Sequence, residues 1–127
     1  MSERPLILIV EDDPTDKGLH ETLMQMEGYD TLLAKDGLEG LLKVEFRHPS
    51  LILLDVMMPN VDGERVLDEL RARPQFASVP VMIVTGRADA HASFDRVVGR
   101  DNVITKPFDA TALARRVADL LATGGEA

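Results

Sequence analysis

The stretch LILIVEDDP (residues 6–14) sets the pattern for the whole chain. Its five apolar residues without a polar interruption indicate a strand that is buried on both faces, as in a parallel sheet. The acids Glu11, Asp12 and Asp13 follow directly, and Asp13 and Pro14 are typical of the cap and the first residue of a helix. The stretch therefore predicts a β-to-α unit with carboxylates at the end of its strand.

The same alternation of short apolar runs and segments of helical period continues along the chain. The further strands are predicted at residues 31–34, 51–54, 81–84 and 103–105. The inward faces of the helices are predicted to be Leu19, Leu23 and Met26; Leu38, Leu41 and Leu42; Val66, Leu67 and Leu70; Ala90, Phe94, Val97 and Val98; and Leu113, Val117, Leu120 and Leu121. Asp13, Asp36 and Asp109 are predicted helix caps. Five strands that alternate with five helices favour an α/β fold, a doubly wound parallel sheet with helices on both faces.

The composition excludes several classes of protein. The 127 residues include four Phe, one Tyr and no Trp or Cys, so the core is aliphatic, and disulfides and cysteine-ligated metal centres are ruled out. Asp and Glu number 22 against 14 Lys and Arg, and the net charge of −8 argues against direct nucleic-acid binding. The apolar runs are too short for a membrane span and the opening MSERP lacks a hydrophobic signal region, so we expect a cytoplasmic protein. We expect one domain over residues 1–122 and a flexible tail at 123–127.

Polar side chains follow the other predicted strands as well. Asp55 ends the third strand, Thr85 and Gly86 end the fourth, and Lys106 ends the fifth. Each alone has a simple structural explanation, as a turn residue, a strand-end hydroxyl or a surface cation. Ligands of such sheets bind at the carboxyl ends of the strands, where these residues and the acids of the first strand meet. The sequence therefore predicts a functional site at this edge.

The chemistry of that edge points to a cation and a phosphoryl group. Two negative charges ~4 Å apart cost about 4 kcal/mol at an effective dielectric of 20, so a cluster of carboxylates needs a counter-ion. Oxygen ligands without a nearby histidine favour Mg²⁺ or Mn²⁺. Lys106, the Thr85 hydroxyl and the backbone amide after Thr85 suit a phosphoryl group, and Asp55 could accept it as an acyl phosphate.

Four motifs together resemble the receiver domains of two-component response regulators. They are VEDDP (residues 10–14), LLDVMMPNVDG (53–63), IVTGR (83–87) and TKPF (105–108), and they span nearly the whole chain. The resemblance implies a flavodoxin-like sheet in the order 2-1-3-4-5. It also implies a signalling module and not a metabolic enzyme, although such a module helps to catalyse its own phosphorylation and slow dephosphorylation.

The resemblance assigns a role to each matching position. Asp55 would accept the phosphoryl group from the phosphohistidine of a histidine kinase or of a histidine phosphotransfer protein. The metal ligands would be Glu11 through water, Asp12 directly, Asp55, and the backbone carbonyl of Met57. Thr85 would bind a phosphoryl oxygen and move on activation, and Lys106 would pair with the phosphoryl group. The bond between Lys106 and Pro107 is cis in the family.

The departures from the family pattern concern signal output. Val103 stands where the family commonly has an aromatic switch residue that moves with Thr85. Met57 and Arg87 occupy two positions that tune dephosphorylation, in a combination similar to winged-helix members that hold their phosphate longer. An output protein would bind the face of the fourth helix, fifth strand and fifth helix. Asn102 and Ala112 replace acids of the family's dimer on that face, so we expect a monomer or a weak dimer.

Two other classes of protein are alternatives to the receiver. An aspartyl-phosphate phosphatase also uses a strand-end Asp and Mg²⁺, but it needs a second Asp where this chain has Met57. An interaction domain that has lost phosphorylation is suggested by Val103 alone. Direct output and a relay to another histidine stay open. His20, His48 and His91 are scattered, and we expect all three at the surface.

Overall fold

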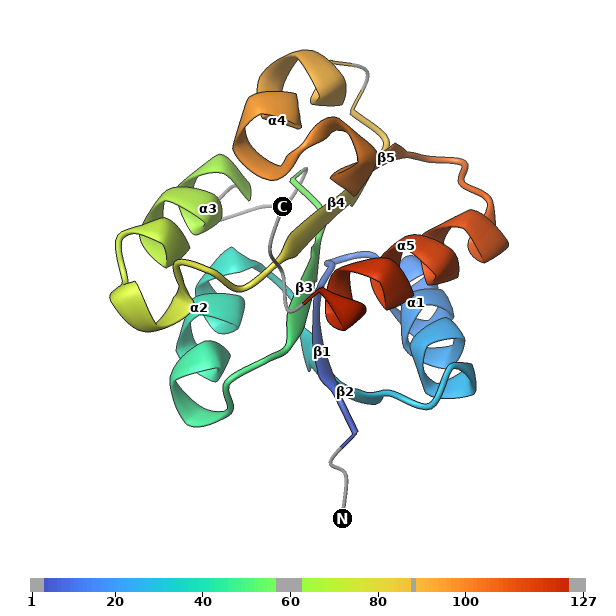
Figure 1. Ribbon diagram of the computed structural model, residues 1–127, viewed down its shortest axis with the longest axis horizontal. Helices are drawn as coiled ribbons and strands as arrows, with labels where there is room; N and C mark the ends of the chain where they lie inside the picture. The colour runs from blue at the N-terminus through green and yellow to red at the C-terminus, as the bar shows by residue number, and fades with distance from the viewer. Residues whose placement is uncertain (1–3, 57–62, 88, 124–127) are drawn as a thin grey trace.

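A parallel sheet in the order β2-β1-β3-β4-β5 forms the centre of the molecule (Figure 1). The computed structural model describes residues 4–56, 63–87 and 89–123. Within them the strands are β1 (Leu6–Val10), β2 (Asp30–Ala34), β3 (Leu51–Leu54), β4 (Val81–Thr85) and β5 (Val103–Thr105). Every pair of neighbours in the sheet is parallel. The predicted fold class and strand order are confirmed.

Helices cover both faces of the sheet. In the described residues the α-helices are α1 (Pro14–Met26), α2 (Gly37–Phe46), α3 (Gly63–Arg71), α4 (Ala90–Val98) and α5 (Ala110–Ala122). Two short 3₁₀ segments that the sequence pattern did not predict are η1 (Pro74–Phe76) and η2 (Arg100–Asn102). Figure 1 shows α1 and α5 together on one face, and α2 and α3 on the other. None of the described helices is long and apolar enough to cross a bilayer.

The apolar strands supply two cores at once because successive side chains point to opposite faces. Ile7 and Ile9 of β1 pack with α1 and α5, whereas Leu8 and Val10 pack with α2, α3 and α4. All five residues of β1 and all four of β3 are buried. The unbroken apolar runs of the sequence therefore reflect burial on both faces, as predicted.

Aspartates begin three of these helices, as predicted. The Asp13 carboxylate accepts hydrogen bonds from the backbone N–H groups of Thr15 and Asp16. Asp36 caps α2 in the same way through the Glu39 N–H, and Asp109 caps α5. These caps satisfy amides that a helix leaves unpaired at its start, so they fix where each helix leaves the sheet edge.

The predicted inward face of α1 is wrong in part. His20 and Met24 are buried, whereas the side chains of Leu19 and Met26 are 52% and 77% exposed. The buried face thus lies one residue further along the helix than the apolar pattern indicated. His20 is 2% exposed and its ring packs against Phe108, which also corrects the expectation that it is a surface residue.

The predicted inward face of α2 is also wrong in part. Leu41 is buried, but Leu38 and Leu42 are more than half exposed. The face toward the sheet is completed by Gly37, Gly40 and Val44. A Cβ at Gly40 would lie 3.1 Å from a Val10 methyl carbon, so the small residue allows close packing on β1.

The other three helices agree better with the pattern. The predicted inward residues of α3 are all buried. In α5, Leu113, Val117 and Leu120 are buried and Leu121 packs partly buried against the same core. In α4, Ala90 and Phe94 are buried, but Val97 is exposed, which corrects that position.

Candidate functional site

The pairing of β1 with β3 brings two acids to one edge of the sheet. Val10 and Leu54 are partners in the register, so Glu11 and Asp55 leave adjacent strands at the same level. The Asp55 N–H donates to the Val10 carbonyl across 3.0 Å, and the Glu11 N–H donates to the Ala34 carbonyl across 3.0 Å. The backbone positions of both acids are therefore fixed by the sheet itself.

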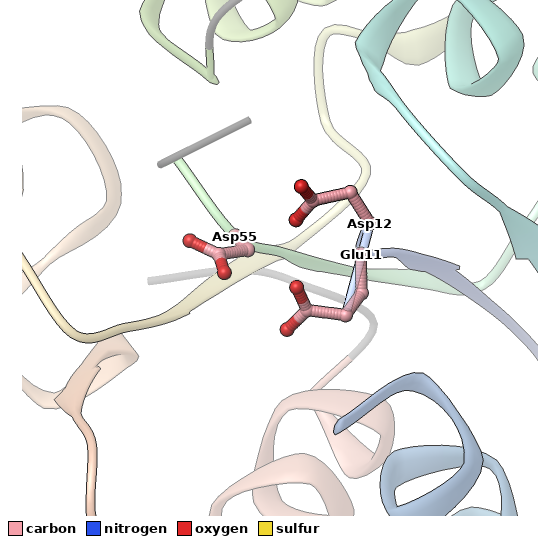
Figure 2. A group of neighbouring side chains, drawn as sticks. All are labelled: Glu11, Asp12 and Asp55. Carbon is pink, nitrogen blue, oxygen red and sulfur yellow. The ribbon is translucent and has the colours of Figure 1, made fainter. Parts of the chain in front are cut away.

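Glu11, Asp12 and Asp55 form a compact group of carboxylates (Figure 2). Each offers an oxygen, and these oxygens all lie within 4.8 Å of one another. Glu11 and Asp55 are buried while Asp12 is exposed, so the group opens to solvent on one side. Three hard oxygen donors at this spacing fit Mg²⁺ or Mn²⁺. Met57, the remaining predicted ligand, lies outside the described residues.

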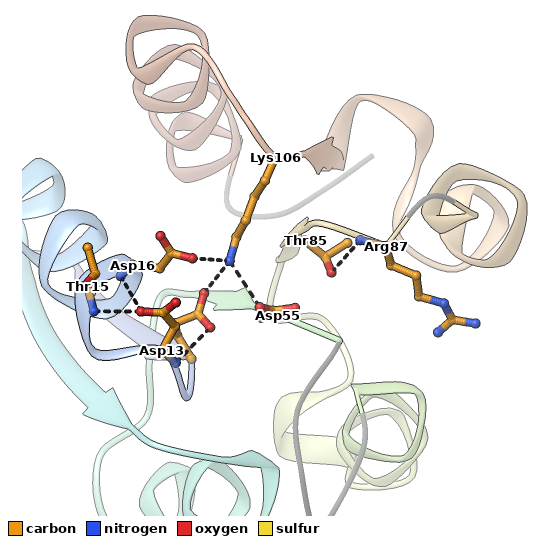
Figure 3. A network of polar contacts seen from close by, with 8 residues as sticks. Asp13, Thr15, Asp16, Asp55, Thr85, Arg87 and Lys106 are labelled. Carbon is orange, nitrogen blue, oxygen red and sulfur yellow. Dashed lines mark hydrogen bonds and ion pairs between the residues drawn. The ribbon is translucent and has the colours of Figure 1, made fainter.

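Lys106 reaches into this group from the end of β5 (Figure 3). Its Nζ lies 2.8 Å from Glu11 Oε1, 2.7 Å from Asp16 Oδ2 and 3.2 Å from Asp55 Oδ2. The lysine is held in place because its backbone N–H donates to the Thr85 carbonyl across 2.8 Å. The next peptide bond, between Lys106 and Pro107, is cis, as expected. The ammonium thus links β1, α1 and β3.

Asp16 is a member of the site that the sequence reasoning missed. It lies in the first turn of α1, three residues after the cap, and its carboxylate faces the lysine from the helix side (Figure 3). An acid at that place is ordinarily explained by its favourable interaction with the helix dipole. Its position just beyond the acids of β1 was the available signal.

Burial and charge shift the pKa values of two groups in the site. Burial raises the pKa of Glu11 to about 7; the nearby Asp55 adds to the rise, and the hydrogen bond from Lys106 opposes it. Burial alone would lower the pKa of Lys106, but its hydrogen bonds to Asp16 and Glu11 and the charge of Asp55 raise that pKa above its ordinary value. Lys106 is therefore a cation at neutral pH, and burial disfavours the ionised form of Glu11.

Thr85 ends β4 fully buried at the same edge of the sheet (Figure 3). Its hydroxyl oxygen accepts a hydrogen bond from the Arg87 backbone N–H across 3.3 Å. A Cβ at Gly86, the next residue, would meet nothing within 4 Å. The site therefore combines an acid cluster, a cation and a hydroxyl.

The two residues that concern signal output lie on the α4 side of the sheet. Val103, the first residue of β5, is buried in the core formed with α2, α3 and α4. Asn102 precedes it and joins two helices: its side chain donates to the Val98 carbonyl across 2.7 Å and accepts from Arg116 Nε across 2.7 Å. Asn102 thus has a structural role where we expected only the absence of an acid.

Comparison with known proteins identifies the family. The family model of the response regulator receiver domain matches residues 7–118. The chain belongs to this receiver family. The DNA-binding dual master transcriptional regulator RpaA of Synechocystis sp. is 39% identical to this receiver over 120 residues, which cover 92% of this chain and 49% of that protein. The receiver thus spans about half the length of that regulator.

Solved receiver structures share the fold closely. The signal receiver domain of a histidine kinase from Syntrophus aciditrophicus is 32% identical, with a TM-score of 0.85 and coverage of 94% of this chain and 91% of that one. A receiver domain of a sensor histidine kinase from Pseudomonas aeruginosa is 26% identical, with a TM-score of 0.80 and coverage of 94% and 99%. That structure has magnesium coordinated in its active site cleft. This receiver carries its own cluster of three carboxylates, and it is a signalling domain, not a conventional enzyme.

Proposed function

We propose that this receiver accepts a phosphoryl group on Asp55 from the phosphohistidine of a histidine kinase or of a histidine phosphotransfer protein. One observation carries the proposal: a buried carboxylate lies beside two further acids and 3.2 Å from a lysine ammonium. A carboxylate next to a cation can act as a nucleophile toward an anionic donor, because the cation offsets their repulsion.

The transfer step forms one bond and breaks one. An oxygen of the Asp55 carboxylate attacks phosphorus, the bond between phosphorus and the histidine nitrogen breaks, and its electron pair stays on that nitrogen. A proton on the other ring nitrogen of the phosphohistidine lets the donor leave as a neutral imidazole, and no oxidant or reductant is needed. Lys106 would stabilise the negative charge of the phosphoryl oxygens in this step, and its contact with Asp55 across 3.2 Å supports this role.

The metal would be held by this receiver's own acids. We propose that Asp12 and Asp55 bind Mg²⁺ or Mn²⁺ directly, that Glu11 binds it through water, and that the Met57 carbonyl is a further ligand. When bound, the ion supplies positive charge for the phosphoryl oxygens. Glu11 also orients Lys106, since its Oε1 accepts from the ammonium across 2.8 Å.

The signal would leave the site through Thr85. The hydroxyl now accepts from Arg87 N–H, and we propose that it turns to donate to a phosphoryl oxygen after transfer. That change would reach α4 through Arg87, and Val103 would move within its core. An output protein would then recognise the surface of α4, β5 and α5. Met57 and Arg87 favour a long-lived phosphoryl group, and the receiver would act as a monomer or weak dimer, either directly or in a relay.

Intact-mass spectrometry after incubation with acetyl phosphate and Mg²⁺ tests the proposal. The wild-type chain should gain one phosphoryl group, and both Asp55→Asn and a metal-free sample should gain none. Asp13→Asn is the matched control, since it removes a charge at the same edge but keeps a residue that caps helices. No adduct on folded wild-type chain, with no inorganic phosphate released, would instead favour an interaction domain without phosphorylation. Steady release of phosphate from an ester would favour a phosphatase.

A further inference from the structure

Asp16 makes the shortest contact of the Lys106 ammonium among the described residues. The distance from Nζ to Asp16 Oδ2 is 2.7 Å, against 3.2 Å to Asp55 Oδ2. Asp16 also lies outside the motifs that carry the family resemblance. Lys106, which we expect to bind the phosphoryl group, is therefore closer to Asp16 than to the proposed phosphoacceptor Asp55.

The contact joins two elements that are distant in sequence, 90 residues apart. Asp16 comes from the first turn of α1, where its backbone N–H donates to the Asp13 cap across 3.3 Å. Its side chain is 32% exposed, while those of Asp55 and Glu11 are 8% and 1% exposed. Asp16 is thus the most exposed of the three acceptors, and Figure 3 shows that it contacts the ammonium from α1.

The charges make Asp16 a competitor for the lysine. A cation held by Glu11, Asp12 and Asp55 would leave the Asp16 charge with Lys106. A phosphoryl group on Asp55 replaces the single carboxylate charge with roughly two negative charges and needs the same ammonium. Asp16 then opposes binding of the phosphoryl group in two ways. It competes for Lys106, and its charge repels the phosphoryl oxygens.

We propose that Asp16 is a positioning residue that restrains Lys106 in the unphosphorylated receiver and thereby weakens binding of a phosphoryl group at Asp55. This inference rests on the function proposed above. A purely structural role for Asp16, as an acid near the helix start, predicts a change in stability alone.

The binding of beryllofluoride distinguishes these two roles. The BeF₃⁻ anion binds a carboxylate oxygen as a phosphoryl group would, so its affinity at saturating Mg²⁺ measures the site without turnover. Asp16→Asn should bind it about two- to fivefold more tightly than wild type, the upper part of the range expected for a partly exposed ion pair. Asp16→Glu, which keeps the charge, should stay near wild type. Asp13→Asn, the matched control, should change affinity less than Asp16→Asn because Asp13 bonds backbone amides and not the lysine.

Equal or weaker beryllofluoride binding by Asp16→Asn would overturn the restraint. A second measurement tests the restraint of Lys106 by Asp16 even if the proposed function is wrong and wild type binds no beryllofluoride. The exchange of the Lys106 ammonium protons with water, followed by ¹⁵N NMR without metal, should be faster in Asp16→Asn than in wild type or Asp13→Asn. Equal exchange in all three would contradict the restraint, whereas an Asp55 that binds no analogue in wild type would contradict the proposed function.

Discussion

The Arg87 side chain bonds Glu64 across 3.1 Å, and this ion pair ties the start of α3 to the segment that follows β4. The same guanidinium bonds Asp89 across 2.6 Å and lies 5.5 Å from the centre of the Phe94 ring. Its backbone N–H meanwhile donates to the Thr85 hydroxyl. A movement of Thr85 is therefore connected to both α3 and α4 through one residue.

Removal of the Arg87 side chain should make the first turns of α3 and α4 less stable. In Arg87→Gln the Glu64 and Asp89 contacts are lost, so amide hydrogen exchange should be faster in the first turns of α3 and α4, with β1 and β3 unchanged. Hydrogen-exchange mass spectrometry checks this, and Arg96→Gln, an exposed arginine of α4, is the control. Unchanged exchange in Arg87→Gln would show that the contacts do not hold the helices.

Magnesium affinity should depend on pH through Glu11. The pKa of Glu11 is raised to about 7 by burial, and metal binding needs the ionised acid. The ionised fraction of such a group rises about tenfold between pH 6 and pH 8, so the affinity should rise by about the same factor and level off above. Calorimetric titration at several pH values measures it. Glu11→Gln should show a flatter profile, and a flat profile in wild type would contradict the assignment.

The raised pKa of Glu11 should also make the metal-free protein less stable as the pH rises. The folded-state pKa of Glu11 lies above its ordinary value of 4.5, so the folded protein holds this proton more tightly than the unfolded chain. This contribution is fully present below pH 4.5 and is lost as the pH rises through about 7. In urea titrations without metal, wild type should lose more stability over that range than Glu11→Gln; a greater loss in the variant would contradict this.

His20 should affect the pH dependence of stability in the opposite direction to Glu11. Burial lowers its pKa below the ordinary 6.5, and its Nε2 has no hydrogen-bond partner among the described residues. As the pH falls below about 6.5 the unfolded chain takes up this proton first, so the folded state loses stability. His20→Leu should therefore lose less stability than wild type between pH 7.5 and pH 5.5. His91, a half-buried residue of α4, is changed to Gln as the control, and equal losses in wild type and His20→Leu would refute the prediction.

The start of α3 should not tolerate a side chain at Gly63. A Cβ there would lie 2.5 Å from the Val56 Cα, which is backbone and cannot move aside cheaply. Gly63→Ala should lower the free energy of unfolding by about 1–3 kcal/mol. Gly18→Ala, within α1 and with nothing within 4 Å, should raise it by about 0.5–1 kcal/mol. Thermal unfolding of the two variants checks the contrast, and a stable Gly63→Ala would show that Val56 can shift.

The sheet was predictable because its strands carry their own signal. The apolar runs that became β1 and β3 have no polar residue, and the site acids Glu11 and Asp55 follow them directly. Because the carboxyl ends of parallel strands meet at one edge of the sheet, the proximity of these two acids was predictable without any side-chain contacts. For Lys106 the same argument gave the right place, since it follows β5.

The helix faces and Asp16 were harder for identifiable reasons. In α1 apolar and polar residues alternate so closely that Leu19 and His20, neighbours in sequence, exchanged their predicted positions. In α2 the packed face uses Gly40, which an apolar pattern does not count. The role of Asp16 depends on a partner 90 residues away, so only the fold reveals it.

Chemical trapping of the phosphorylated residue identifies which acid accepts the phosphoryl group. After incubation with Mg²⁺ and acetyl phosphate, borohydride reduces an aspartyl phosphate to homoserine, which peptide mass spectrometry can locate. If Asp55 is the acceptor, homoserine should be found at position 55 in wild type and at no position in Asp55→Asn. Homoserine at Asp12 or another acid, or none in a folded wild-type sample that holds an added phosphoryl group, would contradict it.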